Sequence, residues 1–134
     1  EKQPHMLELA SSYVESLTGE RYTLDILGIN KGVALINNDG ERLELKFWSS
    51  GLADQVYLAL RLALAKVFSY QVESLPIILD DILVRFDENR QRSALELLAE
   101  LGKNQQIWLF TCQRSVYDMA QSIMGIDCHR LSRS

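Results

Sequence analysis

Two adjacent carboxylates, Asp80 and Asp81, end an apolar run in the segment LPIILDDILVRFDENR, residues 75–90. A third carboxylate, Asp87, follows a few residues later. Like charges side by side repel each other, so ionising both costs free energy unless a positive group lies between them. A bound Mg²⁺ ion is a common solution, because it prefers hard oxygen ligands. The alternative is a solvated loop in which one aspartate caps a turn, and the pair alone favours neither interpretation.

Small residues precede a long apolar segment in WSSGLADQ, residues 48–55. Ser49, Ser50 and Gly51 stand immediately before a predicted helix over residues 53–69. A helix N-terminus offers free backbone N–H groups and the positive end of the helix dipole, and small side chains let an anion approach closely. The three residues are therefore candidates for phosphate binding. A serine N-cap with a glycine turn would give the same sequence, and for these residues alone it is the preferred interpretation.

A third polar position ends the apolar strand in LFTCQ, residues 109–113. Gln113 could orient a water molecule or contact a phosphate, because its amide group both donates and accepts hydrogen bonds. A plain connection between a strand and a helix is the alternative, and without further context it is the preferred one.

The second half of the chain supplies the elements that would bring these residues together. Its apolar pattern predicts helices over residues 53–69, 90–101 and 114–123, strands over 77–79 and 107–111, and a short terminal strand. Fully apolar strands that alternate with helices are typical of a parallel sheet covered on both faces. Ligands of such sheets lie beyond the carboxyl ends of the strands, which is where Asp80, Asp81 and Gln113 are expected.

The first half predicts a helix followed by an antiparallel meander. Apolar residues recur at helical spacing over residues 6–17, and strands are predicted over 21–28, 32–37 and 42–47. The sequence Asn38-Asp39-Gly40 is a strong hairpin turn between the last two strands. The fold class is therefore α/β, an antiparallel meander followed by parallel strands covered by helices.

The composition is that of an ordinary globular domain. Of 134 residues, 47% are hydrophobic and 24% are charged, and the net charge of −4 argues against coating nucleic acid through bulk positive charge. No apolar run reaches the roughly 18 residues that a membrane span needs, and the N-terminus lacks a signal-peptide layout. Cys112 and Cys128 make no disulfide framework, so we expect a reducing cytoplasm and a small, buried hydrophobic role for both.

The order of the three polar stretches makes each of them more specific. WSSGLADQVYLALRLALA resembles the signature motif and signature helix of an ABC-type ATPase. LPIILDDILVRFDENR resembles a Walker B strand followed by a D-loop, and IWLFTCQ resembles the strand leading to the switch residue. Together they resemble the C-terminal lobe of an ABC-type head, a P-loop NTPase, of the SMC/SbcC-like branch and its YhaN-like relatives. The resemblance runs from about Thr18 to the C-terminus.

The resemblance implies roles for the residues of the signature motif and the D-loop. Ser49 and Gly51 match positions that contact the γ-phosphate held by the opposite subunit of a dimer, and Ser50 lies between them in the same nucleotide-binding motif. Asp87 matches a D-loop aspartate at the dimer interface. Arg61 matches a signature-helix arginine that relays the nucleotide state in the SbcC-like group, with an ordinary exposed helix charge as the alternative.

The Walker B and switch positions match the family with two departures. Asp80 matches the aspartate that holds Mg²⁺ through water. Asp81 falls where the family usually has a glutamate that activates the attacking water, and it is one methylene shorter. Gln113 takes the place of the usual switch histidine and cannot take up a proton near neutral pH. Turnover is therefore expected to be slow or to use another group.

The Walker A motif G-x-x-x-x-G-K-[ST] is missing from these residues. In SMC/SbcC-like proteins it belongs to an N-terminal lobe across a long coiled coil, so residues 1–17 are expected to end the returning coiled-coil helix and 18–134 to form the C-terminal lobe. The implied cofactors are ATP and Mg²⁺. The implied partners are a Walker A lobe, in the same or a separate chain, a second head in a homodimer, DNA and a nuclease subunit. DNA repair or chromosome maintenance is the implied role, and the isolated chain is expected to be inactive.

Two other functions fit part of the pattern. A degenerate ATPase-like lobe that only binds or scaffolds is favoured by Asp81 and Gln113. A receiver-like phosphoacceptor domain also carries paired aspartates, but at the end of its first strand, near the start of the domain. Here the pair lies past the middle of the chain, behind an antiparallel meander, which disfavours that class.

Overall fold

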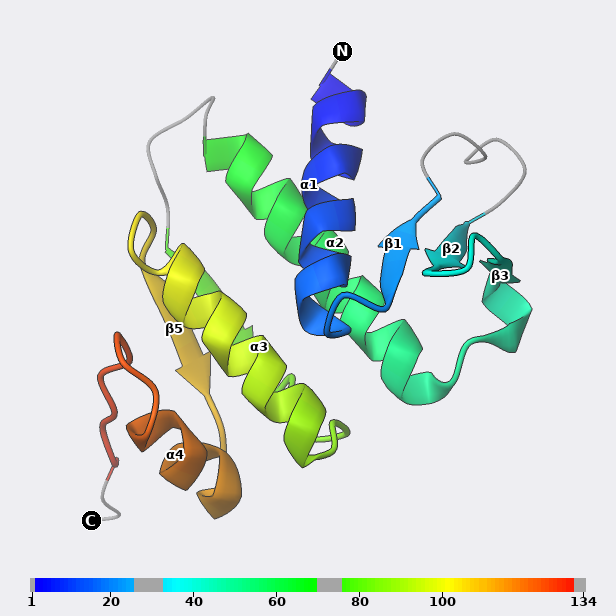
Figure 1. The fold of residues 1–134 in the computed structure, drawn as a ribbon. Coiled ribbons are helices and arrows are strands. Elements are labelled where there is room, and N and C mark those ends of the chain that lie inside the picture. The colour runs from blue at the N-terminus through cyan, green and yellow to red at the C-terminus, as the bar shows by residue number, and fades with distance from the viewer. Residues whose placement is uncertain (1, 26–32, 70–75, 132–134) are drawn as a thin grey trace.

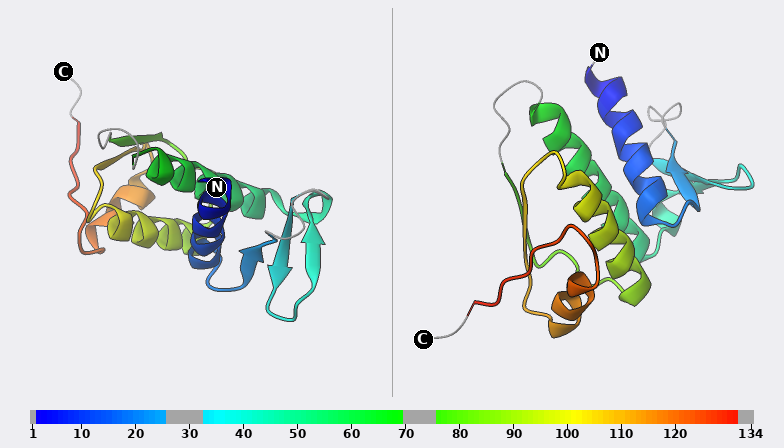
Figure 2. Two further views of the ribbon diagram at one scale, coloured as in Figure 1. Left: turned by 90° about the horizontal axis from the view of Figure 1, so that it is seen from above. Right: turned by 60° about the vertical axis from the view of Figure 1, so that its left-hand side comes forward.

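The computed structural model describes residues 2–25, 33–69 and 76–131, with side chains from residue 5 onward. In chain order the elements are α1 (Lys2–Leu17), β1 (Tyr22–Leu24), β2 (Ala34–Asn37), β3 (Arg42–Glu44), η2 (Leu45–Phe47), α2 (Ser50–Ser69), β4 (Ile77–Asp80), α3 (Glu88–Leu101), β5 (Ile107–Phe110) and α4 (Arg114–Gln121). The meander and α4 lie at opposite ends of the molecule, with the long helices between them (Figure 1, Figure 2). The predicted α/β class is confirmed.

The main core forms where α1 packs across α2 (Figure 1). The buried face of α1 is the stripe that its helical spacing predicts, Ala10, Tyr13, Val14 and Leu17. Thr18 ends the helix, since its hydroxyl donates to the Val14 carbonyl at 2.8 Å and accepts from the Tyr22 backbone N–H at 3.2 Å. The chain therefore turns directly from α1 into β1.

The meander is a three-stranded antiparallel sheet in the order β1-β2-β3. Tyr22 lies opposite Asn37, and Leu35 lies opposite Leu43. The predicted hairpin turn is present, with the Asn37 side-chain oxygen accepting from the backbone N–H groups of residues 39 and 41 at 2.9 Å each.

The first and third predicted strands are shorter than the sequence pattern indicates. The strand predicted over 42–47 ends at Glu44, because the chain turns through η2 toward α2, and this leaves Leu45 56% and Phe47 64% exposed. The strand predicted over 21–28 spans only Tyr22–Leu24, and residues 26–32 lie outside the described residues. Asp25, which the alternation places on the open face, is buried and forms an ion pair with Arg42.

The second sheet pairs β4 and β5 in parallel, as predicted, with Leu79 opposite Leu109 and Asp80 opposite Phe110. One face, which carries Leu79, joins the same core cluster as residues of α2 and α3. The other face is open, because Ile78 is 57% exposed, Trp108 46% and Phe110 43%. The prediction that this sheet is covered on both faces is therefore wrong for the described residues, which supply helices to one side only.

Helix α3 connects the two parallel strands and lies against β5 in the views of Figures 1 and 2. It begins after Asp87, whose side chain caps it, and it buries Ala94, Leu97 and Leu98 of the predicted stripe. It ends at Gly102, as predicted, although this glycine has φ −66° and so ends the helix without a left-handed residue.

The C-terminal segment differs from the prediction in two respects. Residues 126–131 form no strand, so the predicted terminal strand is wrong for the described part of the chain. Cys112 is exposed and Cys128 half-buried, so neither is the fully buried residue expected. Partial burial, with a smaller contribution from Asp127, raises the pKa of the Cys128 thiol. Over the described ranges, no helix is long and apolar enough to cross a membrane.

Candidate functional site

The two carboxylates lie at the carboxyl end of the parallel sheet, as predicted. Asp80 is the last residue of β4, it is exposed, and it lies opposite Phe110 of β5. Asp81 follows, and its backbone N–H donates to the Phe110 carbonyl at 2.7 Å, which continues the pairing by one bond. The Asp81 backbone then adopts φ +56°, a left-handed conformation that turns the chain out of the strand.

Two buried side-chain oxygens at this edge have no hydrogen-bond partner among the described residues, Asp81 Oδ1 and Gln113 Oε1. Gln113 stands three residues after the end of β5, where its backbone N–H donates to the Thr111 hydroxyl at 3.1 Å. A buried acceptor without a partner costs about 1–3 kcal/mol, so such atoms usually face a water, an ion, a ligand or another chain. The sheet therefore brings two unused acceptors to one edge, at positions that the sequence predicts as catalytic.

The carboxylates fit a metal site that is completed from elsewhere. Within the described ranges, no three His, Cys, Asp or Glu side chains are placed to hold a metal ion together. Mg²⁺ usually keeps several waters and takes one or two protein carboxylates together with phosphate oxygens. Asp80, exposed at the strand end, supplies one such carboxylate, and Asp81 stands next to it in the chain.

The serine-glycine turn forms the start of α2, which begins at Ser50 rather than at residue 53 as predicted. The Ser49 hydroxyl accepts from the Leu52 backbone N–H at 3.1 Å, which is the capping contact that fixes the earlier start. Ser49 and Ser50 are exposed, whereas Gly51 is buried. The capping role of Ser49 is therefore present, and the two serines also remain accessible to a ligand at the helix N-terminus.

The start of α3 lies against the start of α2 through a pair of arginines. Arg90 Nε donates to Gln55 Oε1 at 3.2 Å, and Arg90 Nη1 donates to Asp87 Oδ2 at 3.2 Å. Arg85 forms a two-pronged ion pair with Asp54, at 3.0 Å through Nε and 2.6 Å through Nη2. The turn at residues 49–51 and Asp87 are therefore connected within one chain.

The absence of a side chain at Gly51 leaves room for the Arg90 guanidinium, which a Cβ atom would force to move. A Cβ atom at Gly51 would lie 2.4 Å from Arg90 Nη1 and 2.9 Å from Arg90 Cζ, which is closer than real atoms approach. Asp87 takes part on the other side, since its Oδ1 accepts from the Arg90 backbone N–H at 2.9 Å and so caps α3. Asp87 itself is 60% exposed in its side chain, and can meet a partner.

The sequence predictions missed Asp54, Gln55, Arg85 and Arg90 as members of this region. The signal that could have found Gln55 is its polarity on a helix that is otherwise apolar almost all round. Gln55 is 1% exposed and uses both ends of its amide, with Nε2 donating to the Leu17 carbonyl at 2.6 Å. A buried amide in this setting needs two partners, and the sequence does not say which ones.

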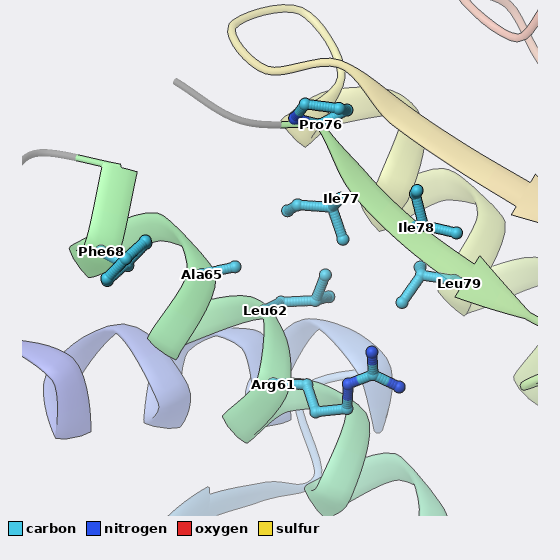
Figure 3. A pocket seen from close by; sticks show the side chains of 8 residues that line it. All are labelled: Arg61, Leu62, Ala65, Phe68, Pro76, Ile77, Ile78 and Leu79. Atoms are coloured by element: carbon cyan, nitrogen blue, oxygen red, sulfur yellow. The ribbon is translucent and has the colours of Figure 1, made fainter. Parts of the chain in front are cut away.

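Arg61 lies apart from these contacts, on the exposed side of α2. Its guanidinium lies 5.9 Å from the ring centre of Tyr57. Together with Leu62, Ala65 and Phe68 it lines a groove of about 260 Å³ against the start of β4, residues 76–79 (Figure 3). The structure thus places Arg61 beside the Walker B-like strand, while its predicted relay role stays a prediction.

The predicted site residues form two groups in the described structure. Side-chain hydrogen bonds connect the start of α2 with the start of α3, and among the described residues none connects either of them to Asp81 or Gln113. One group, at the edge of the sheet, consists of Asp80, Asp81 and Gln113. The other consists of the turn at residues 49–51 together with Asp87.

Comparison with known sequences gives one informative relative. No protein-family model matches the chain. Over 122 residues the chain is 34% identical to YhaN of Bacillus subtilis strain 168, which is described as an uncharacterized protein. The match covers 89% of this chain and 12% of YhaN, so this chain corresponds to a small part of that relative.

Comparison with solved structures identifies the fold. The SMC head domain from Thermotoga maritima superposes with a TM-score of 0.69 at 20% identity, over 87% of this chain and 40% of that one. The Smc head domain from Pyrococcus furiosus with an extended coiled coil, bound to the C-terminal domain of ScpA, gives 0.62 at 13% identity, over 90% of this chain and 30% of that one. A structure described under ATP-driven dimerization and DNA stimulated activation of SMC ATPases gives 0.62 at 15% identity, over 90% and 78%. The chain therefore has the fold of part of an SMC-type ATPase head, and its sequence is similar to a segment of YhaN.

Proposed function

We propose that this chain is the C-terminal lobe of an SMC/SbcC-like head that binds and hydrolyses ATP once a Walker A lobe joins it. The observation that carries the proposal is the pair of buried, unpartnered oxygens, Asp81 Oδ1 and Gln113 Oε1, at the carboxyl edge of the parallel sheet. In α/β folds this edge is where ligands bind.

The roles of the edge residues follow from their chemistry. Asp80 would hold Mg²⁺ through water, and the ion would neutralise charge on the phosphates of ATP. Asp81 Oδ1 would accept the proton of the attacking water, and burial keeps this acceptor from pairing with bulk solvent. The Gln113 amide would orient the water or a phosphate oxygen without taking up a proton.

The second group of residues would meet another head. Ser49 and Ser50 are exposed at the N-terminus of α2, where they would meet the γ-phosphate held by an opposite head, and Gly51 completes the turn beneath them. Asp87 is exposed next to this turn and would contact that head. ATP would then join the two heads, and its hydrolysis would release them. The ATP-driven dimerization named for an SMC structural neighbour supports this assignment.

An N-terminal lobe is supported by the apolar surface that this chain leaves uncovered. One side of α2 exposes Tyr57, Leu64 and Phe68 beside Arg61, and the open face of the sheet exposes Ile78, Trp108 and Phe110. Parallel sheets are almost always covered on both faces, so a further part of the head is expected here. In this arrangement α1 would be the end of the returning coiled-coil helix, residues 1–17, and residues 18–134 the lobe.

The cellular role of such a head would be DNA repair or chromosome maintenance in the cytoplasm, with DNA and a nuclease subunit as further partners. The DNA stimulated activation named for a structural neighbour supports DNA as the partner to test first. Arg61, beside the groove between α2 and β4, would relay the nucleotide state to the rest of the head.

The test is ATP hydrolysis by the full-length protein with Mg²⁺, with Asp81→Asn as the matched variant. Asp81→Asn keeps the size of the side chain but removes the proton acceptor, so we expect it to lower the turnover number by about 100-fold or more. The isolated 134-residue chain should hydrolyse negligible ATP.

Two outcomes would contradict the enzymatic proposal. If the full-length protein is no faster than Asp81→Asn, the head does not hydrolyse ATP, and ATP-dependent dimerisation without turnover would then support the scaffold alternative. Rapid hydrolysis by the isolated chain would show that no Walker A lobe is needed.

A further inference from the structure

Arg90 occupies the space between the proposed signature turn, residues 49–51, and the proposed D-loop residue, Asp87. Its guanidinium donates to Gln55 Oε1 of α2 and to Asp87 Oδ2 at the start of α3, both at 3.2 Å. It lies so close to Gly51 that a methyl group there would overlap Nη1 at 2.4 Å. A planar group with several fixed donors can hold both oxygens at once, which a lysine ammonium on a flexible stem cannot reproduce.

The contact is anchored on both sides. Gln55 is 1% exposed, and its Nε2 donates to the Leu17 carbonyl at 2.6 Å, which fixes the amide and aims Oε1 at Arg90. Asp87 accepts from the Arg90 backbone with its other oxygen at 2.9 Å, which fixes this carboxylate at the start of α3. The Arg90 side chain is 28% exposed, so its hydrogen bonds are partly shielded from water.

We infer that Arg90 is a positioning residue that holds the signature turn, residues 49–51, in a fixed place relative to Asp87. The inference rests on the proposed function, in which both segments meet the opposite head. Fixing them against each other before the heads meet removes the cost of ordering them on dimerisation. The same contact explains the glycine at position 51, because a residue without Cβ leaves room for the Arg90 guanidinium where it lies.

The neighbouring ion pair is the weaker of the two links. Arg85 contacts Asp54 with good geometry, but the Arg85 side chain is 66% exposed, so water and salt screen the pair. Arg90 is the better shielded arginine and the one that touches the turn itself, so we assign the positioning role to Arg90.

The experiment compares Arg90→Gln with Arg92→Gln in the full-length protein. Arg92 is exposed on the same helix two residues away, so its substitution removes the same charge without touching the turn. We expect Arg90→Gln to weaken ATP-dependent dimerisation about tenfold or more, since hydrogen bonds to a charged group are lost, and Arg92→Gln to leave it unchanged. Sedimentation velocity with Mg²⁺ and ATP measures dimerisation, and a fluorescent ATP analogue measures ATP binding by the monomeric head.

ATP binding by the monomeric head shows whether a variant loses only the positioning of the turn or the folded structure of the head as a whole. It should be equal in both variants, because the Walker A lobe of the same head holds that nucleotide. Arg90→Lys keeps the charge but not the fork, so it should restore only part of the dimerisation. Equal dimerisation by Arg90→Gln and Arg92→Gln would overturn the inference, and so would a matching loss of ATP binding by Arg90→Gln.

A double-mutant cycle with Gly51→Ala tests the contact itself. In the wild-type background the added methyl group displaces the guanidinium and should weaken dimerisation as much as Arg90→Ala does. In the Arg90→Ala background the guanidinium is gone, so the same methyl group should weaken dimerisation less than it does in the wild-type background. Penalties that add in full would overturn the inference.

The outcome for the wild type keeps the two proposals distinguishable. If the wild-type protein does not dimerise with ATP, the proposed function fails and the positioning role fails with it. If the wild type dimerises and the Arg90 variants do so equally well, only the positioning role fails.

Discussion

At the scale of single residues, the backbone conformation of Asp81 suits a short acidic side chain. The residue has φ +56°, a left-handed conformation that most side chains avoid but that aspartate and asparagine tolerate. A glutamate at this position would gain no such tolerance. The shorter acid therefore suits the turn out of β4, quite apart from what it does to a bound water.

This explanation predicts the effect of restoring the longer side chain. Asp81→Glu should lower the free energy of unfolding of the 134-residue chain by about 1 kcal/mol, because an ordinary residue pays that much for the left-handed conformation. Urea denaturation followed by circular dichroism measures the change. Asp80→Glu is the matched control, since it makes the same substitution one residue earlier in β4 and should cost only a few tenths of a kcal/mol. Equal costs for the two variants would show that the backbone at residue 81 is not the reason.

At the scale of elements, the start of α3 depends on one side chain. Asp87 Oδ1 accepts from the Arg90 backbone N–H at 2.9 Å and satisfies a donor that has no partner within the helix. The same residue also contacts the Arg90 side chain, so the cap and the link to α2 share one carboxylate.

Loss of this cap should be measurable as stability. Asp87→Ala is expected to lower the free energy of unfolding by about 1 kcal/mol, the usual cost of losing an N-cap. Asp118→Ala provides the control, since Asp118 forms only an exposed ion pair within α4, at 3.7 Å from Arg114, and should change stability by a few tenths of a kcal/mol. The cap would be unimportant if both variants unfolded at the same urea concentration.

At the scale of the whole molecule, one face of the parallel sheet is apolar and open. Ile78, Trp108 and Phe110 belong to the strands that carry the candidate site, yet 43–57% of their surface is exposed. A sheet of two parallel strands with one bare face is an incomplete layer.

The fluorescence of Trp108 tests whether a Walker A lobe binds to this open face of the sheet. Adding the Walker A lobe should bury Trp108 and shift its fluorescence to shorter wavelength, because the indole leaves water. The measurement uses a Trp48→Phe background, which leaves Trp108 as the remaining tryptophan. A Trp108→Phe variant that keeps Trp48 should show no such shift. An unchanged Trp108 spectrum in the assembled protein would mean that the lobe binds elsewhere.

The sequence by itself determined the order of the elements and much of the candidate site. Apolar spacing gives the helices over residues 6–17 and 90–101, because helical periodicity depends on neighbours only a few residues apart. Fully apolar strands on either side of a helix predict the parallel pairing of β4 with β5. Polar residues at strand ends gave Asp80, Asp81 and Gln113, since parallel strands end at one edge.

Only the tertiary structure decided how these pieces are held together. Arg90 and Gln55 are 35 positions apart in the chain, and no local pattern indicates that they meet. The early end of β3 likewise depends on where the chain must turn between the meander and the core. The open sheet face could not be foreseen either, because an apolar strand looks the same in sequence whether its cover lies in this chain or in another. Sequence periodicity shows which face of a helix or strand is apolar. Which other element packs against that face is decided only in the folded, assembled molecule.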